Sequence, residues 1–193
     1  MTESRSPAHF QRIYDANPDP WGFASKPYEQ EKYRRTVQAL GGRRFASGLE
    51  IGCSLGFLTR MLAPECEALL GVDLLEQPLE AARQRCADQP RVRFERMQVP
   101  GEWPDGRWDL IVLSEVLYFL TPADIDRCAG RVLASLLPNA MVVLVNWLGQ
   151  SDDPCTGDEA ANRFITAAAG PLRVVHQDRQ PGYRLDVLAS ARA

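Results

Sequence analysis

Short apolar runs alternate with helical patterns along the chain, from about residue 45 to residue 150. Apolar runs bounded by polar segments are typical of strands that are buried on both faces, and apolar residues at helical spacing are typical of helices packed on a sheet. This order predicts a mainly parallel sheet with helices on both faces. We expect strands at 47–51, 68–73, 92–96, 108–113 and 141–147, and helices between them at 56–62, 75–87 and 123–136.

Residues 1–44 precede this alternation. They begin with a polar segment that is interrupted by proline and carries a dense turn signal at 17–22. Apolar and aromatic residues at near-helical spacing then predict a helix over 28–40, which a pair of glycines ends. We expect residues 1–44 to form an N-terminal helical lid beside the core.

The chain ends in a different pattern. After residue 147 a polar loop leads to an expected helix at 158–168. Two β-rich stretches follow, 172–177 and 183–190, and the link between them is short enough to predict an antiparallel hairpin. We therefore expect one core domain over residues 45–193, in which a mainly parallel sheet ends in a reversed strand.

The composition is ordinary for a soluble globular protein with one domain. The 193 residues are 45% hydrophobic and 24% charged, and the net charge of -3 with interspersed signs disfavours nucleic acid and anionic lipid as partners. The five cysteines form no Cys-x-x-Cys pair, which is typical of reduced thiols, and the isolated His9 and His176 support no metal site. No apolar run approaches the roughly 20 residues of a membrane span. We expect a cytoplasmic protein without a metal or a membrane segment.

A glycine-containing turn follows the first expected strand. Gly52 and Gly56 stand where strand passes into helix, so that the backbone can approach a ligand that a Cβ would exclude. Asp73 ends the next strand about twenty residues later, where an acid can accept hydrogen bonds from ribose hydroxyls. The turn departs from the dinucleotide fingerprint, because residues 53–54 lack its middle glycine and Glu50 precedes the turn. A carboxylate there repels phosphate and favours a cation.

These two elements resemble the first motifs of class I S-adenosylmethionine-dependent methyltransferases. The segment 108–118, which begins Trp-Asp-Leu-Ile and continues to an acid, is similar to the fourth-strand motif of that superfamily. The closing hairpin is also typical of its sheet. The resemblance covers roughly residues 45–150 and implies a single-domain, Rossmann-like α/β fold with a mainly parallel seven-stranded sheet, an antiparallel C-terminal hairpin and S-adenosylmethionine as cofactor.

A narrower resemblance, to the nodulation protein S (NodS) family, runs through most of the chain. It is carried by Asp19-Pro20-Trp21, Tyr28-Glu29-x-x-Lys32-Tyr33, Val99-Pro100-x-x-Trp103-Pro104, Ser114-Glu115-Val116-Leu117-Tyr118 and Pro154-Cys155-Thr156-Gly157-Asp158-Glu159-Ala160-Ala161. Members of that family N-methylate the free amine of a deacetylated chitooligosaccharide. The resemblance therefore implies a small-molecule acceptor, such as an amine of an amino sugar, a chitooligosaccharide-like oligosaccharide or a similar molecule.

The expected cofactor site combines strand ends with the N-terminal segment. Acids would hold the ammonium and the ribose, apolar and amide groups the adenine, aromatic faces the sulfonium, and a lysine the cofactor carboxylate. The alternative is that these acids and glycines only cap helices and form turns, and that the lysine belongs to a solvated face. The candidate residues are Tyr14, Trp21, Lys32, Glu50, Gly52, Cys53, Ser54, Gly56, Asp73, Leu74, Met97, Gln98 and Ser114.

The expected acceptor site lies past the fourth strand. Methyl transfer to an amine is an in-line displacement, which needs alignment and a deprotonated nucleophile. Glu115 and Tyr118 are candidates to orient the amine and take its proton, with substrate anchoring, a structural hydrogen bond or core packing as alternatives. Trp147, Asp158 and Glu159 are candidates to contact the acceptor, although the two acids also suit the first turn of a helix.

Two other functions compete with methyl transfer. A nicotinamide-dependent oxidoreductase would need the dinucleotide turn, and the missing middle glycine argues against it. A cofactor-binding regulatory module without catalysis would share the cofactor residues, and only the acceptor site separates it from an enzyme.

Overall fold

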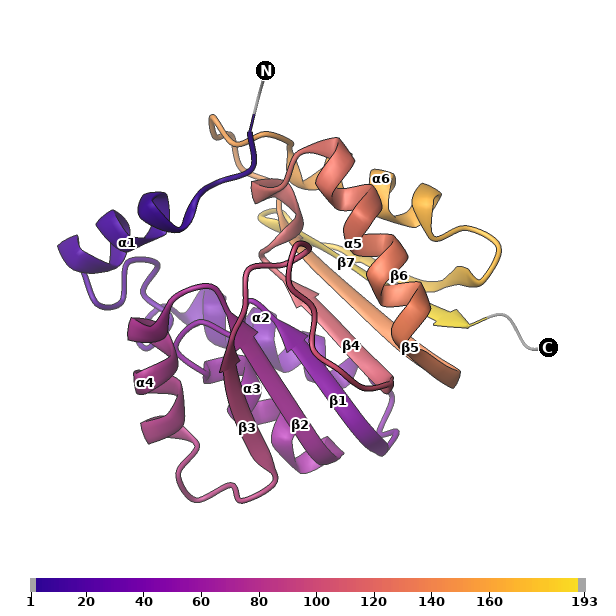
Figure 1. The fold of residues 1–193 in the computed structure, drawn as a ribbon, viewed down its shortest axis with the longest axis horizontal. Helices are drawn as coiled ribbons and strands as arrows, with labels where there is room; N and C mark the ends of the chain where they lie inside the picture. Colours follow the sequence, from indigo (N-terminus) through magenta and orange to yellow (C-terminus); the bar gives the residue numbers. More distant parts are fainter. Residues whose placement is uncertain (1–2, 191–193) are drawn as a thin grey trace.

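The apolar runs form one seven-stranded sheet in the order β3-β2-β1-β4-β5-β7-β6 in a computed structural model, which describes residues 3–190 (Figure 1). Strands β1 to β5 pair in parallel, and β7 runs antiparallel between β5 and β6. This confirms the expected fold class and its closing hairpin. The strands are β1 (Phe45–Ile51), β2 (Cys66–Asp73), β3 (Val92–Arg96), β4 (Trp108–Ser114), β5 (Leu136–Trp147), β6 (Leu172–Arg179) and β7 (Tyr183–Ser190).

Helices cover both faces of the sheet. In Figure 1, α5 lies in front of the sheet, and α2 and α3 lie behind it. Two separate apolar clusters agree with this, since one joins the sheet to α5 and α6 and the other joins it to α2 and α3. The helices are α1 (Pro7–Ala16), α2 (Pro27–Gln38), α3 (Phe57–Leu62), α4 (Glu76–Arg85), α5 (Pro122–Ser135) and α6 (Gly157–Ala167), with short 3-10 turns η1 (Ala63–Glu65) and η2 (Leu117–Phe119).

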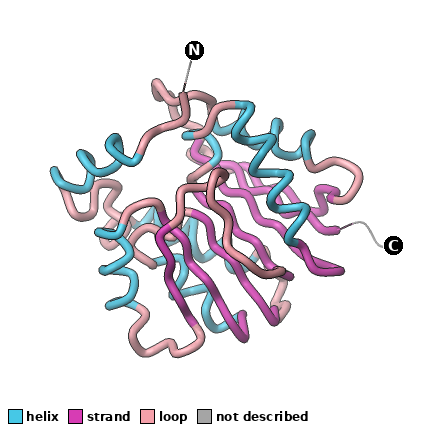
Figure 2. Tube along the Cα trace, in the orientation of Figure 1, coloured by secondary structure: helices cyan, strands magenta, loops and turns pink. Residues whose placement is uncertain are grey.

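The polar N-terminal segment contains a helix that the sequence pattern did not predict. Helix α1 begins at Pro7, whose ring suits a first helical position, and buries only Phe10 and Tyr14. Such a narrow apolar stripe gives little periodic signal in so short a segment. The helix lies beyond the carboxyl ends of the parallel strands (Figures 1 and 2), where Phe10 packs edge-on against Phe119 with ring centroids 4.8 Å apart.

One boundary differs from the expected one by several residues. Strand β5 begins at Leu136, directly after α5, whereas the apolar run predicts a start at 141. Leu136 pairs with Trp108, and the register then shifts until Met141 pairs with Leu110. The intervening residues include Asn139 in a left-handed conformation, with φ of 59°. This irregularity hides the first part of the strand from a period-two pattern.

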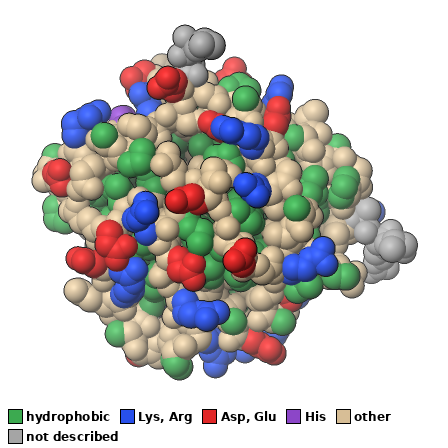
Figure 3. Space-filling view, viewed as in Figure 1, with side chains coloured by type: hydrophobic (Ala, Val, Ile, Leu, Met, Phe, Trp, Pro, Cys, Tyr) green, Lys and Arg blue, Asp and Glu red, His purple; other side chains and the backbone are tan. Residues whose placement is uncertain are grey.

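The surface carries charges of both signs. Figure 3 shows Lys and Arg side chains interspersed with Asp and Glu on one face, with hydrophobic side chains between them. The five cysteines are buried and free. Within residues 3–190, no helix combines the length and the apolar character that crossing a membrane requires.

Candidate active site

A cavity of about 770 Å³ opens at the carboxyl ends of the parallel strands. Its walls come from the ends of β1, β2 and β4, from the loop after β3, and from α1, α2 and the turn between them. Ligands of doubly wound sheets bind at this edge, because the strand order reverses there and leaves a crevice between neighbouring loops. Here the reversal falls at β1, between β2 and β4.

The turn after β1 brings the backbone against this cavity. Gly52 has a φ of +76°, and a Cβ on it would lie 2.3 Å from Cγ2 of Val116, so a side chain would be both strained and blocked. The amides of Gly52 and Cys53 both donate to the carbonyl of Val72, at 2.8 and 3.0 Å, which ties the turn to β2. Gly56 has the same φ but packs against α4 outside the cavity lining, so its place is structural.

Asp73 faces the cavity with half of its acceptor capacity in use. Its Oδ2 accepts from the amide of Ser54 at 3.0 Å, and its Oδ1 accepts from the amide of Leu75 at 3.1 Å. A carboxylate offers about four lone-pair sites, so each oxygen retains one. Burial raises the pKa of Asp73 to about 6, although the backbone amides work against that rise. Two adjacent acceptor positions on a fixed carboxylate fit the vicinal hydroxyls of a ribose.

Glu50 is a buried carboxyl group with spare acceptor capacity. The residue is 1% exposed, and its Oε2 has no hydrogen-bond partner among the described residues. Burial raises the pKa of Glu50 to about 8, and the charge of Asp73 adds to the rise. A cationic ligand group beside Oε2 would restore the charged form. The two acceptor carboxylates of Glu50 and Asp73, together with the glycine turn, therefore fit the cofactor that the sequence implies.

We expect the substitution Glu50→Gln to flatten the pH dependence of stability in the ligand-free protein. Between pH 4.5 and about 8 the folded carboxyl keeps a proton that the unfolded chain has lost. The free energy of unfolding therefore falls as pH rises through this window, by up to about 1.4 kcal/mol per pH unit. Urea unfolding at several pH values measures the slope. An unchanged slope in Glu50→Gln, with the exposed Glu95→Gln as control, would contradict the shifted titration.

Further strand ends complete the cavity wall. Leu74 follows β2, Met97 and Gln98 follow β3, and Ser114 ends β4, and all four line the cavity as expected of cofactor contacts. Trp147, at the end of β5, also lines it and is 36% exposed. The indole therefore stands at the open side of the cavity, where a candidate acceptor contact belongs.

The N-terminal segment closes over the turn after β1. The hydroxyls of Tyr14 and Ser54 lie 2.5 Å apart and share a hydrogen bond, and the Trp21 ring meets Tyr14 edge-on with centroids 5.5 Å apart. At the other end of the cavity, Nε of Arg5 donates to Oδ1 of Asp153 at 2.8 Å. The two contacts hold α1 across the cavity, so the expected aromatic residues lie at its wall.

Three hydrogen bonds hold the side chain of Glu115 in the cavity. Its Oε1 accepts from Nζ of Lys32 at 2.8 Å, and its Oε2 accepts from the Tyr118 hydroxyl and from the amide of Trp147, both at 2.9 Å. Its backbone is left-handed, with φ of 59°. Nζ of Lys32 also lies 2.9 Å from Oε2 of Glu29. A fixed carboxylate with one lone pair left on Oε1 can hold and deprotonate an amine.

Lys32 lines the cavity, but its ammonium does not fit the cofactor carboxylate for which the sequence proposed it. The nitrogen is already held by Glu29 and Glu115. A third carboxylate at this position would meet two of its own sign, so the structure gives no support to that contact. Arg34 of the same helix is half exposed, pairs with Glu31 and lies outside the cavity lining.

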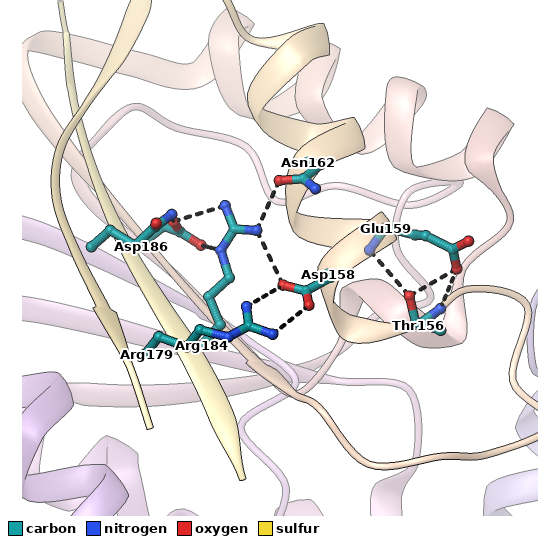
Figure 4. A network of polar contacts seen from close by, with 8 residues as sticks. Thr156, Asp158, Glu159, Asn162, Arg179, Arg184 and Asp186 are labelled. Atoms are coloured by element: carbon teal, nitrogen blue, oxygen red, sulfur yellow. Dashed lines mark hydrogen bonds and ion pairs between the residues drawn. The ribbon is translucent and has the colours of Figure 1, made fainter. Parts of the chain in front are cut away.

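The two acids of the late loop lie away from the cavity. Asp158 accepts from both Arg179 and Arg184, at 2.7 and 3.3 Å, and its pKa is lowered chiefly by the hydrogen bond from Arg179 (Figure 4). Glu159 forms a capping box with Thr156, whose amide donates to the Glu159 carboxylate at 2.8 Å. Neither lines the cavity. Both side chains make contacts that stabilise α6, and the structure does not bring them together with the other acceptor candidates.

The sequence pattern did not assign a role to several residues that line the cavity. Glu29, Tyr28 and Phe10 come from α1 and α2, and Arg5 and Asp153 come from segments 148 residues apart. Glu29 had a local signal, because it lies three residues before Lys32 on one helix face. The pair of Arg5 and Asp153 had none, since only the fold brings the two together.

The chain is similar in sequence to one protein family and to several of its curated members. A family model described as "Nodulation protein S (NodS)" matches residues 8–148. Nodulation protein S of Bradyrhizobium diazoefficiens is 35% identical over 122 residues, which cover 62% of this chain and 57% of that protein. The Sinorhizobium fredii protein is 31% identical over 120 residues, which cover 62% of this chain and 56% of that protein. The matches thus span a little over half the length of these curated relatives.

Solved structures share the fold. The N-methyltransferase NodS from Bradyrhizobium japonicum WM9 in complex with S-adenosyl-L-homocysteine superposes with a TM-score of 0.83 at 24% identity, over 96% of this chain and 98% of that chain. A DhpI complex with the same compound, SAH, gives a TM-score of 0.76 at 16% identity, over 95% of each chain. Both likenesses therefore extend over nearly the whole chain.

Proposed function

Because the chain belongs to the nodulation protein S family, we propose that it transfers a methyl group from S-adenosylmethionine to an amine of a small molecule. A Bradyrhizobium relative of the same fold is named an N-methyltransferase, which favours an amine as the acceptor. The family resemblance of the sequence suggests an amine of an amino sugar or oligosaccharide. One observation carries the proposal. Glu50, Asp73 and the coordinated carboxylate of Glu115 line the same cavity.

The residues on the cofactor side would bind and orient. S-adenosylmethionine, when bound, would supply a methyl group on a sulfonium, and an amine could attack the methyl carbon in line with its bond to sulfur. Asp73 would accept from the ribose hydroxyls with its two remaining lone pairs, and Glu50 would face the cationic part of the amino acid tail. Met97 and Gln98 would lie against the adenine. These contacts fix the donor while α1 covers it from solvent.

The residues on the acceptor side would prepare the nucleophile. A protonated amine has a lone pair for attack only after it loses a proton, and Glu115 Oε1 has a free lone pair that could accept that proton. Tyr118 and the Trp147 amide hold the other oxygen, so the carboxylate keeps one orientation. The five buried thiols suit a reducing compartment, which supports a cytoplasmic location for the reaction.

We expect labelled methyl groups to pass from S-adenosylmethionine to at least one member of a panel of glucosamine oligomers, aminoglycosides and simple amines. Calorimetry should show that S-adenosylhomocysteine binds and NADH does not. Binding of NADH alone would favour an oxidoreductase and overturn the proposal. Binding of S-adenosylhomocysteine without methylation of any amine would instead favour a regulatory module.

A further inference from the structure

Three charged side chains form a buried cluster at the acceptor end of the cavity. The side chains of Glu29, Lys32 and Glu115 are 8%, 3% and 18% exposed, and one ammonium lies between two carboxylates at 2.9 and 2.8 Å. Given the methyl transfer proposed above, on which this role depends, we propose that Lys32 and Glu29 are positioning residues for Glu115. They set the orientation of its carboxylate and keep it free of a proton, so that it can accept one from the amine.

The geometry assigns the orientation of Glu115 to three separate elements. Lys32 of α2 donates to Oε1. Tyr118 of η2 and the backbone amide of Trp147, at the end of β5, both donate to Oε2. Lys32 is the charged donor of the three, and charged hydrogen bonds are roughly twice as strong as neutral ones. The N-terminal segment therefore does more than cover the cavity, since it supplies the cation that fixes the proposed base.

Glu29 explains why a lysine can remain charged at this depth. Burial by itself would favour neutral Lys32, but the charges of Glu115 and Glu29 outweigh burial and raise the pKa of the ammonium. The aromatic rings of Tyr28 and Tyr33 lie 5.3 and 5.9 Å from the same nitrogen and add to its stabilisation. The cluster carries a net charge of about -1 when all three groups are ionised. That charge also attracts a protonated amine toward Glu115.

The proton balance of the step follows from this arrangement. The amine gives a proton to Oε1 of Glu115, and its lone pair then forms the new bond to the methyl carbon as the carbon–sulfur bond breaks. Glu115 returns the proton to water when the product leaves. Lys32 keeps its own protons throughout. Without Lys32, two carboxylates would face each other in a buried site with no cation between them, and like charges at close range disfavour ionisation of both.

The phenols near the cluster stay in one form over the neutral range. Burial raises the pKa of each neighbouring phenol, so that these hydroxyls remain neutral. Glu50 and Asp153 act on these phenols from other elements and are unchanged in the variants considered below, whereas Glu29, which also acts on them, is replaced in two of the variants. The neighbouring groups are Tyr28 and Tyr33 of α2, Tyr118 of η2, Glu50 of β1 and Asp153 of the loop after β5.

The test compares the pH profile of turnover in the whole protein carrying Lys32→Met, Glu29→Gln or both substitutions. We expect Lys32→Met to lower kcat about tenfold at pH 7 and to move the acid limb of the profile up by about one pH unit, with S-adenosylhomocysteine affinity within about threefold. Glu29→Gln should move the acid limb of the pH profile to lower pH or leave it in place. The double variant should recover the limb position, because Glu115 then has no like charge beside it.

The controls separate this role from simple packing. The acceptor amine titrates in the same way in every assay. A difference in the acid limb between variants therefore arises from the cluster of Glu29, Lys32 and Glu115. Lys32→Arg keeps the charge and should keep the limb, and together with Glu29→Gln it tests the proposal if Lys32→Met does not fold. A loss of kcat with an unmoved limb in Lys32→Met, or losses that add in the double variant, would overturn the positioning role alone. A wild-type protein that methylates no amine would overturn the proposed function, and this role with it.

Discussion

Replacing Glu115 with glutamine is expected to lower kcat about 100-fold while the affinity for S-adenosylhomocysteine changes by no more than about threefold. Glutamine keeps the size of the side chain, and its amide oxygen can still accept from Tyr118 and from the amide of Trp147. Its nitrogen cannot take a proton from the acceptor. The loss therefore falls on the proton transfer and spares the cofactor. Steady-state kinetics with a competent amine and calorimetry with S-adenosylhomocysteine measure the two parts separately.

The matched control for this prediction is Glu95→Gln, an equal change at an exposed position on β3 outside the cavity lining. It should leave both quantities unchanged. Wild-type turnover in Glu115→Gln would exclude an essential proton acceptor at this position. An equal loss of turnover and cofactor affinity would place Glu115 at the cofactor, in which case its contacts with Lys32 and Tyr118 would serve binding.

The alternation of apolar runs was sufficient to predict the fold, because strands that are buried on both faces leave a strong signal. The expected strand 108–113 lies within the buried strand β4, and the hairpin of β6 and β7 follows from the short link between two β-rich stretches. Helix α1 escaped prediction because only Phe10 and Tyr14 are buried in it. Its position depends on contacts with Phe119 and Ser54, far along the chain.

The site was predictable to the extent that topology alone determines it. Parallel strands bring their carboxyl ends to one edge of the sheet. The backbone positions of Glu50, Asp73 and Glu115 therefore lie at that edge regardless of side-chain contacts. Ion pairing between distant elements cannot be read from spacing. Asp158 faces two arginines of the hairpin, which removes it from the cavity, and Lys32 faces Glu115 where a ligand carboxylate was expected.

Removing the carboxylate of Asp73 should give the largest loss of cofactor affinity. We expect Asp73→Ala to weaken S-adenosylhomocysteine binding by roughly 1.5 to 3 kcal/mol, or about 10- to 150-fold, because a buried charged acceptor of two hydroxyls is lost. The pKa of about 6 adds a pH dependence in the ligand-free protein. As pH falls through 6 the carboxyl gains a proton and loses acceptor capacity, so wild-type affinity should fall on the acid side. Calorimetry at pH 5 and pH 8 measures both effects.

Asp73 also accepts from the amides of Ser54 and Leu75, so a weaker affinity could reflect a loosened turn. Asp109 offers the matched control, because its carboxylate likewise accepts two backbone amides, those of Ala46 and Ser47, each at 2.9 Å, and lies outside the cavity lining. Asp109→Ala removes the same kind of contact near the starts of β1 and β4 and should bind the ligand as the wild type does. Unchanged affinity in a folded Asp73→Ala would refute the ribose contact. Equal losses in both variants would assign the effect to the sheet rather than to a ligand contact.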